Sequence, residues 1–371
     1  IAQRGYYDFK IYARKSEFLG VTQRAFPSGA VDFIQANGIT GPVFNDFNSG
    51  AYLVGRLYPQ IKVFIDGRTE VYGSKFFLVY RQIWEDGNRQ VFDALTLRYG
   101  LRAIVLGSAF GHIPERLLQM LDKNPAWKLV YFDHDGLVFL RNIPANAALI
   151  KKFHIDLKQW KPLPFDIPRM GVVRAYPYRE ANRAATLNDM GYPDQAMAEA
   201  DAALAISPEC DEALYIKARV YLDRKDFSKA FKFYRYGLLR SFDDVKLRRG
   251  LALSYIGMGK YAQAVEQADR LEGVAGDPSG PYIRAKVFVK KKQYHEAYDI
   301  LTKRIFPLER GIPEIVAIGD IYMEDGVYDL AVQAYALALR KNTRKDVRNI
   351  RILKKYRDAV IKRQEGKGKS K

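Results

Sequence analysis

The sequence predicts a three-layer α/β domain with a mostly parallel sheet, followed by an all-α superhelix of about five repeats with a C-terminal capping helix. Two observations support this prediction. Strands alternate with helices between residues 26 and 142, which is typical of α/β domains. One short pattern then returns five times between residues 177 and 344. The length of 371 residues agrees with two domains.

The repeated pattern is a loop that closes on an alanine, as in Gly-Lys-Tyr-Ala-Gln-Ala at residues 259–264. The closing alanines lie about 33–34 residues apart, and a small residue stands twelve positions before each. Stacked helix pairs need small side chains where they touch, so both sets predict helix–helix contacts. The closing alanines are Ala196, Ala230, Ala264, Ala297 and Ala331, and the small residues are Ala184, Ala218, Ala252, Ala285 and Gly319.

This period resembles that of the tetratricopeptide (TPR) family, in which each repeat is a helix-turn-helix. Aromatic residues three positions before four of the closing alanines predict a plug for each turn, and Pro193 replaces that plug in the first repeat. Residues 177–344 are therefore expected to form a TPR array. Helical spacing after Thr343 predicts a helix that caps the last repeat, with a basic tail, over residues 345–371.

The region from residue 26 to residue 142 reads as alternating elements. The last two strands flank Asp133-His134-Asp135-Gly136, which predicts a hairpin at an antiparallel edge with a positive φ at Gly136. The predicted strands are 42–44, 62–66, 102–106, 127–132 and 137–140, and the predicted helices are 27–38, 49–57, 74–85, 89–99 and 112–122.

Two further segments complete the organisation. Residues 1–25 carry aromatic and basic side chains in an amphipathic lead-in, read either as a helix lying on the first domain or as a juxtamembrane segment. Residues 143–176 contain several prolines and predict a linker rather than a third domain. Because Ile1 is not a start methionine, we expect an upstream part of the protein to precede it.

Two junctions between strand and loop in the α/β region form a candidate ligand loop. Open α/β sheets place ligands where strands end, which makes polar residues at these junctions candidates for binding. The alternative is structural: Ser49 or Asn48 caps a helix, Gly67 supplies a turn, and Asp66 pairs with Arg68. The candidate residues are Asn45, Asp46, Asn48, Gly50, Asp66, Arg68 and Tyr72.

The order of elements in residues 15–142, with Phe64-Ile65-Asp66-Gly67-Arg68, resembles a known family. It is similar to the extracytoplasmic C-terminal α/β domain of bacterial multi-spanning membrane glycosyltransferase-like proteins, which are related to oligosaccharyltransferases. The latter carry Trp-Trp-Asp-Tyr-Gly where this chain has Asp46-Phe47-Asn48-Ser49-Gly50, so peptide-acceptor recognition by this loop does not carry over. The resemblance implies a periplasmic or outer-face location, with catalytic acids in loops between membrane helices.

The remaining sequence features argue against a membrane span, a metal site and a catalytic site in this chain. No apolar run of about 18 residues is present, four histidines and Cys210 lack metal-ligand spacing, and no local signature marks a catalytic set. Gly107-Ser108-Ala109-Phe110-Gly111 follows a strand but lacks the lysine of a phosphate-binding loop. We therefore predict no catalytic residues, no metal and no cofactor.

The net charge of +18 is unevenly distributed. The first 170 residues carry roughly +7, residues 171–340 about +1, and the remainder roughly +10. The repeats are thus nearly neutral, and the basic character is largely terminal, so nucleic acid is not the expected partner.

The first helix of each TPR hairpin lines the concave face of the array, which places a set of basic and tyrosine residues there. Such a face suits a peptide with acidic residues or a C-terminal carboxylate, and the alternative is a solvated groove without a ligand. The predicted groove residues are Tyr215, Arg219, Arg249, Tyr282 and Lys286.

The sequence thus predicts a non-catalytic interaction scaffold, the extracytoplasmic part of a membrane glycosyltransferase-like protein whose TPR repeats recruit a protein or acidic peptide. Its membrane link would lie in a missing N-terminal part. Two alternatives stay open: a free-standing α/β enzyme regulated by its repeats, and a basic adaptor for RNA or a membrane surface.

Overall fold

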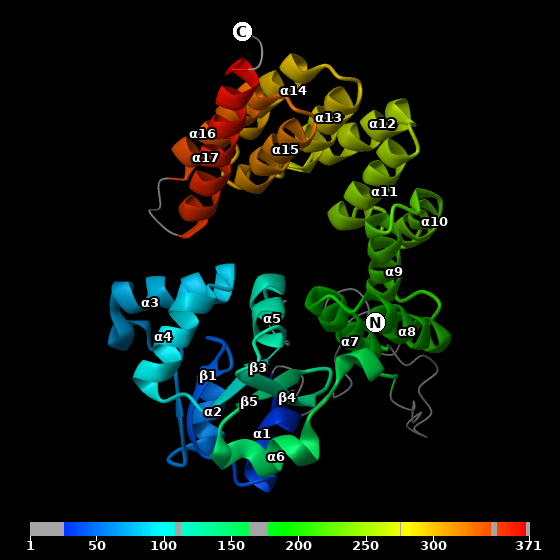
Figure 1. The fold of residues 1–371 in the computed structure, drawn as a ribbon. Helices are drawn as coiled ribbons and strands as arrows, with labels where there is room; N and C mark the ends of the chain where they lie inside the picture. The colour runs from blue at the N-terminus through cyan, green and yellow to red at the C-terminus, as the bar shows by residue number, and fades with distance from the viewer. Residues whose placement is uncertain (1–25, 108–112, 163–176, 275, 343–346, 369–371) are drawn as a thin grey trace. The chain divides into compact units, whose positions relative to one another are not determined.

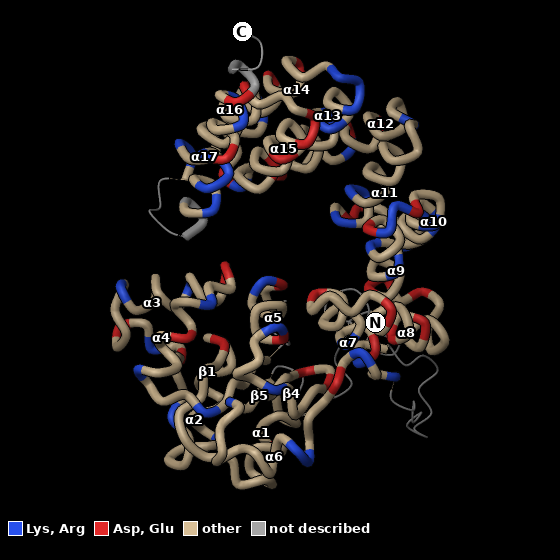
Figure 2. Tube along the Cα trace, in the orientation of Figure 1, with Lys and Arg blue, Asp and Glu red and all other residues tan. Residues whose placement is uncertain are grey.

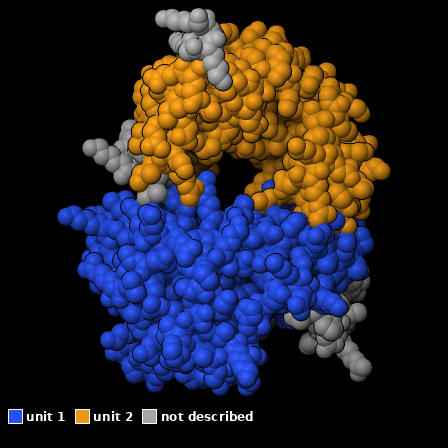
Figure 3. Space-filling view, viewed as in Figure 1, with its two compact units in different colours: residues 1–216 blue, residues 217–371 orange. Residues whose placement is uncertain are grey.

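The computed structural model describes residues 26–107, 113–162, 177–274, 276–342 and 347–368 (Figure 1). The chain divides into two compact units, Ile1–Ile216 and Lys217–Lys371 (Figure 3). The predicted lead-in over residues 1–25 lies outside the described residues, as do residues 163–176 of the predicted linker and the last three residues of the basic tail.

The first unit contains a mixed five-stranded sheet in the order β2-β1-β3-β5-β4. Strands β2, β1 and β3 pair in parallel, and the β4–β5 hairpin joins them through β5, which runs antiparallel to both β3 and β4. The predicted antiparallel hairpin therefore lies at one edge of the sheet, with β4 outermost and β5 as the strand that runs opposite to the other four. The strands are β1 (Gly41–Asn45), β2 (Ile61–Val63), β3 (Ala103–Gly107), β4 (Trp127–Phe132) and β5 (Gly136–Arg141).

Helices cover both faces of this sheet. Val43, Val105 and Val138 share one hydrophobic cluster with residues of α1, α2 and α6. Successive side chains of a strand point to opposite faces, and Phe44, between Val43 and Asn45, contacts rings from α3 and α4 instead. The helices of this region are α1 (Ser28–Ala36), α2 (Gly50–Leu57), α3 (Thr69–Asp86), α4 (Arg89–Tyr99), α5 (Glu115–Asp122) and α6 (Ala147–Phe153).

Three local expectations are corrected. The strand predicted over residues 62–66 ends at Val63, because the Asn45 side chain replaces a neighbouring strand as the partner of the next backbone groups. Helix α6 and two 3₁₀ turns, η4 (Pro144–Asn146) and η5 (Leu157–Gln159), occupy part of the predicted linker. Gly136 does not adopt a positive φ; it is needed because an added Cβ would lie 2.9 Å from the Cβ of Pro27.

The first helix pair, α7 (Tyr178–Met190) and α8 (Pro193–Ile206), belongs to the same compact unit as the sheet. The hydroxyl of Tyr192 donates to Asp122 Oδ2 of α5 at 2.8 Å, and Gln119 Nε2 donates to the carbonyl of Asp189 at 3.2 Å. Side-chain contacts thus join the first repeat to the α/β region.

The repeats form the predicted pairs of helices. Every closing alanine and every predicted small residue is buried, and a Cβ added to Gly319 would lie 2.8 Å from the Tyr335 ring. This confirms that small side chains mark the helix contacts. The remaining pairs are α9 (Asp211–Asp223) with α10 (Phe227–Leu238), α11 (Val245–Gly257) with α12 (Tyr261–Glu272), α13 (Ser279–Lys290) with α14 (Tyr294–Ile300), which a π-helical turn η6 (Leu301–Ile305) extends, and α15 (Ile312–Glu324) with α16 (Tyr328–Lys341).

The turn inside each helix pair requires one residue with a positive φ. Glycine occupies this position in three repeats, at Gly191, Gly259 and Gly326. Lys225 and Lys292 occupy it in the other two, with φ of 60° and 62°. A residue with a Cβ is strained in this left-handed conformation, whereas glycine is not.

Replacing Lys225 with glycine should therefore raise the free energy of unfolding by roughly 0.5–1 kcal/mol, because it relieves the left-handed strain. Thermal and urea unfolding of the full chain measures the change. Lys225→Ala is the matched control, since it removes the same long side chain and keeps the strain. Equal stability of the two variants would contradict a backbone origin of the effect.

Candidate functional site

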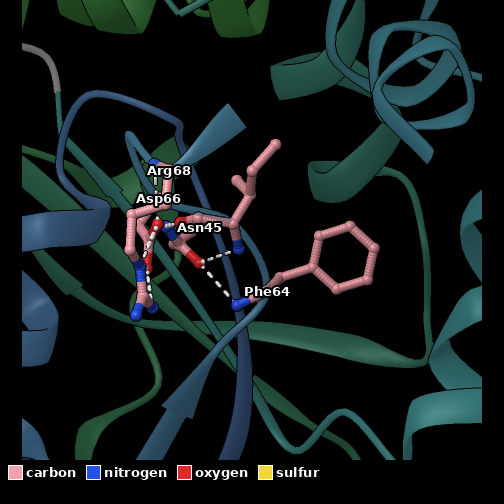
Figure 4. A network of polar contacts seen from close by, with 5 residues as sticks. Asn45, Phe64, Asp66 and Arg68 are labelled. Atoms are coloured by element: carbon pink, nitrogen blue, oxygen red, sulfur yellow. Dashed lines mark hydrogen bonds and ion pairs between the residues drawn. The ribbon is translucent and has the colours of Figure 1, made fainter. Parts of the chain in front are cut away.

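The predicted ligand loop lies at the carboxyl ends of β1 and β2. Asn45, Asp46 and Asp66 are buried there, with exposed fractions of 0%, 3% and 2%. Figure 4 shows Asn45 reaching across to the backbone of the segment after β2, next to Asp66 and Arg68. The structure therefore brings together residues of the two predicted junctions.

Both polar atoms of the Asn45 side chain form hydrogen bonds that join the ends of β1 and β2. Its Oδ1 accepts from the backbone N–H groups of Phe64 at 2.8 Å and Ile65 at 3.3 Å. Its Nδ2 donates to the carbonyls of Asp46 at 2.8 Å and Ile65 at 2.7 Å. Such a set of bonds satisfies buried backbone groups that the short strand β2 leaves unpaired.

Asp46 links β1 to β3 and to the start of α2. Its Oδ1 accepts from the N–H of Ser49, and its Oδ2 accepts from the N–H of Gly107, each at 2.8 Å. Burial raises the pKa of Asp46, although these hydrogen bonds oppose the shift. Gly107 begins the loop considered for phosphate binding, and residues 108–111 of that loop lie outside the described residues.

Asp66 and Arg68 form the ion pair considered in the structural alternative. The Arg68 guanidinium donates to both carboxylate oxygens, from Nε to Oδ1 at 3.0 Å and from Nη2 to Oδ2 at 2.5 Å. This contact lowers the pKa of Asp66, and a hydrogen bond with Tyr72 acts in the same direction. The Arg68 side chain is 63% exposed, so it remains accessible from solvent.

The other two members of the loop differ in exposure. Asn48 is exposed in the turn before α2, and neither it nor Ser49 caps that helix through a side-chain bond. Gly50 is buried against the segment after β2, where an added Cβ would lie 2.2 Å from the carbonyl oxygen of Ile65. Close approach of two backbones thus explains Gly50. Of the predicted set, Asn48 and Arg68 are exposed and Tyr72 is partly exposed.

The second predicted site lies on the first helices of the second, third and fourth repeats, α9, α11 and α13. The Arg249 guanidinium of α11 lies over the ring of Tyr282 on α13, 4.7 Å from its centroid. The Lys286 ammonium lies 5.5 Å from the same centroid. Three of the five predicted groove residues therefore form one cluster, which we call the Tyr282 cluster (Arg249, Tyr282 and Lys286).

Glu314 of α15 adds an acidic group that the sequence did not predict. Its Oε1 accepts from Arg249 Nη1 at 3.0 Å, and the side chain is only 6% exposed. Arg249 Nη1 also lies 3.3 Å from the hydroxyl of Ser279. Arg249 thus bridges three successive repeats, and its charge is already paired within the array.

Lys286 is the cation of the cluster that has no carboxylate within salt-bridge distance among the described residues. Burial lowers its pKa, and the positive charges of Lys290 and Arg249 act in the same direction, whereas Glu324 opposes them. An added carboxylate near Lys286 would relieve this destabilisation of its charged form.

Tyr215 and Arg219 lie four residues apart on α9, which places them on the same face of that helix. The boundary between the two compact units passes between them. Each of the two side chains has interaction partners in the structure.

Within the described ranges, no three His, Cys, Asp or Glu side chains gather closely enough to hold a metal ion. Likewise, none of the helices described is both long and apolar enough to span a bilayer. The only cysteine in the sequence, Cys210, is buried.

No family model and no curated protein matches the chain. Solved structures that are similar include a thermophilic TPR protein of Thermus thermophilus, at 21% identity and a TM-score of 0.40, covering 49% of this chain and 97% of the other. A TPR protein from Parabacteroides merdae is similar at 19% identity and a TM-score of 0.40, covering 51% and 73%. Because these scores are below 0.5, the assignment of TPR-type repeats rests on the helix pairs of the chain itself.

Proposed function

We propose that the chain is a protein-interaction scaffold whose repeats bind an acidic peptide through the Tyr282 cluster. The observation that carries this proposal is Lys286, a largely buried cation held beside Arg249 on the ring of Tyr282 without a carboxylate of its own. A fold does not gain stability from two neighbouring cations. A partner's carboxylate would offset their repulsion and accept charge-assisted hydrogen bonds.

The proposed ligand chemistry is a peptide carboxylate, either an Asp or Glu side chain or a C terminus. Arg249 is held by Glu314, so Lys286 is the group expected to contact the ligand first. The Tyr282 ring is buried and holds the two cations beside each other through its π face. Binding should weaken with added salt because the pairing is electrostatic.

The test is fluorescence anisotropy with labelled acidic peptides whose C termini are either free or amidated, titrated with the full chain. Lys286→Met should weaken binding of the acidic peptides by roughly tenfold, since a hydrogen bond to a charged group contributes about 1.5–3 kcal/mol. Lys232→Met is the matched control, because it removes an exposed lysine from α10, outside the Tyr282 cluster. Equal loss in both variants, or no binding of any acidic peptide, would count against the cluster as the site.

Lys286→Met also has an expected effect on stability. A folded-state pKa below the ordinary 10.5 means that the unfolded chain binds more protons in the window between the two values. The native protein should therefore gain stability as pH rises through that window, and the variant should lack this gain while being at least as stable at pH 7. A variant less stable than the native chain at pH 7 would mark Lys286 as a structural residue.

The proposal also covers the fold of residues 26–142 and the location of the protein. We infer that residues 26–142 form a three-layer α/β domain of the extracytoplasmic type found in membrane glycosyltransferase-like proteins, with a periplasmic location. The support is the order of elements β1, α2, β2, α3 and the Phe64–Arg68 segment at the end of β2. Reading the gene upstream of Ile1 tests it: many hydrophobic spans in frame are expected, and a start codon directly upstream would refute it.

A further inference from the structure

Helix α17 (Val347–Gly368) packs on α15 and α16 of the last repeat. Ile352 and Ala359 are buried, with exposed fractions of 5% and 0%. Lys355 Nζ contacts Asp320 Oδ1 of α15 at 2.5 Å, and Arg363 lies 3.8 Å from Asp329 of α16. These contacts determine which side of α17 faces away from the repeats.

The opposite side of α17, its outer face, consists of Ile350, Leu353, Lys354, Arg357 and Ile361. The three aliphatic side chains are 62%, 50% and 44% exposed in that order along the chain. The spacing of these residues repeats with the helical period, so they form one stripe about 16 Å long. A helix that only capped the array would gain nothing from large aliphatic side chains on this side.

The outer face is also basic. Lys354 is exposed and has no ion pair among the described residues, and Arg357 is 74% exposed with only its helical neighbour Asp358, 4.0 Å away. Helix α17 contains eight Lys and Arg residues and two acidic ones. Lys and Arg, drawn blue in Figure 2, recur along its length.

We propose that the outer face of α17 docks the chain on an anionic lipid surface. Aliphatic side chains enter the boundary between headgroups and acyl chains, while lysine and arginine contact lipid phosphates, which is how interfacial amphipathic helices bind. A bilayer needs no complementary pocket, which suits one convex helical stripe.

Other occupants fit this stripe less well. A second copy packed on it would place Lys354 and Arg357 opposite like charges. Nucleic acid would pair with the two cations but leave Ile350, Leu353 and Ile361 unused. A protein interface of standard size buries about 800 Å² per partner, which exceeds what one stripe of about 16 Å supplies. This proposal is independent of the Tyr282 cluster, which lies on other helices.

The experiment is co-sedimentation of the full chain with phosphatidylcholine vesicles, with and without about 30% phosphatidylglycerol to supply the anionic surface. Binding is expected only to the anionic vesicles. Lys354→Glu with Arg357→Glu should lower the partition coefficient by roughly thirtyfold or more, from about 1 kcal/mol per basic residue. Ile350→Ser with Leu353→Ser should lower it by roughly tenfold, because both apolar contacts are lost.

Matched controls use exposed residues elsewhere: Lys151→Glu with Lys152→Glu on α6, and Leu239→Ser with Phe242→Ser after α10. Both should bind vesicles like the native chain. Three results would overturn the proposal. They are an equal loss of binding in the controls, a loss in the charge variant but not in the Ile350→Ser and Leu353→Ser variant, and binding of a single-stranded oligonucleotide that needs only Lys354 and Arg357. Dimerisation abolished by Ile350→Ser would also overturn it, in favour of a contact between copies.

Discussion

Replacing Arg183 with methionine should lower the free energy of unfolding of the first unit by about 3–5 kcal/mol, the cost of leaving a buried charge without its partner. Arg183 of α7 donates to Glu199 Oε1 of α8 at 2.8 Å and to Glu199 Oε2 at 3.0 Å. Its side chain is 3% exposed, and that of Glu199 is fully buried. The effect should appear as an earlier transition in urea unfolding of the full chain.

The cluster around Glu199 extends to the chain before the first repeat. Trp160 Nε1 donates to Glu199 Oε1 at 2.7 Å, and Glu180 Oε1 accepts from Arg183 Nη2 at 3.2 Å. Burial alone would lower the pKa of Arg183, but the hydrogen bonds and charges of the two glutamates outweigh it and raise the pKa. The arginine charge therefore stabilises the two buried carboxylates, and the carboxylates stabilise the arginine charge.

A double variant separates the charge from the packing. Arg183→Met combined with Glu199→Gln keeps an acceptor for Trp160 and removes the uncompensated carboxylate, so it should be more stable than Arg183→Met alone. Arg183→Lys keeps the charge without the two-pronged donor geometry and should recover only part of the loss. A double variant no better than the single one would show that packing, and not the buried charge, sets the cost.

The repeats were predictable because their contacts are encoded at fixed intervals. A helix pair packs closely only where alanine or glycine stands at both contact points, and the periodic series from Ala184 to Ala331 marks those points in the sequence. The same regularity extends to the turns, where Gly191, Gly259 and Gly326 alternate with lysines in the left-handed conformation. Local sequence and tertiary contact agree in this part of the chain.

The candidate sites were only partly predictable, because their decisive contacts join residues far apart in the sequence. Arg249 was expected to face a ligand, yet it pairs with Glu314, 65 residues later. No spacing rule for a single repeat marks such a partner, since the contact crosses two repeat boundaries. Helix α6 was missed because the prolines around it outweigh the short apolar pattern of Leu149, Ile150 and Phe153, which pack on the sheet.

The role of Asn45 shows why a polar residue at a strand end need not bind a ligand. Its position after a buried strand predicted a binding residue. Its side chain instead forms hydrogen bonds with backbone groups of Phe64 and Ile65 and with the carbonyl of Asp46. These bonds replace strand pairing after Val63, where β2 ends. Whether a side chain turns toward its own backbone or toward solvent depends on the geometry of the neighbouring strand, which periodicity alone does not give.

Replacing Asn45 with alanine should lower the free energy of unfolding of the first unit by about 2–4 kcal/mol, because buried N–H and carbonyl groups lose their partners at about 1–3 kcal/mol per group. Amide hydrogen exchange of Phe64 and Ile65 should accelerate in the same variant.

Asn45→Asp is the matched control. It keeps the shape of the side chain but places a buried carboxylate against the carbonyl of Ile65, 2.7 Å from the native Nδ2. Burial would raise the folded-state pKa of that carboxyl above its unfolded value, so the folded chain binds the extra proton. The deficit of Asn45→Asp should therefore shrink as pH falls toward the unfolded pKa, while that of Asn45→Ala stays constant; parallel pH profiles for the two variants would contradict this account of the site.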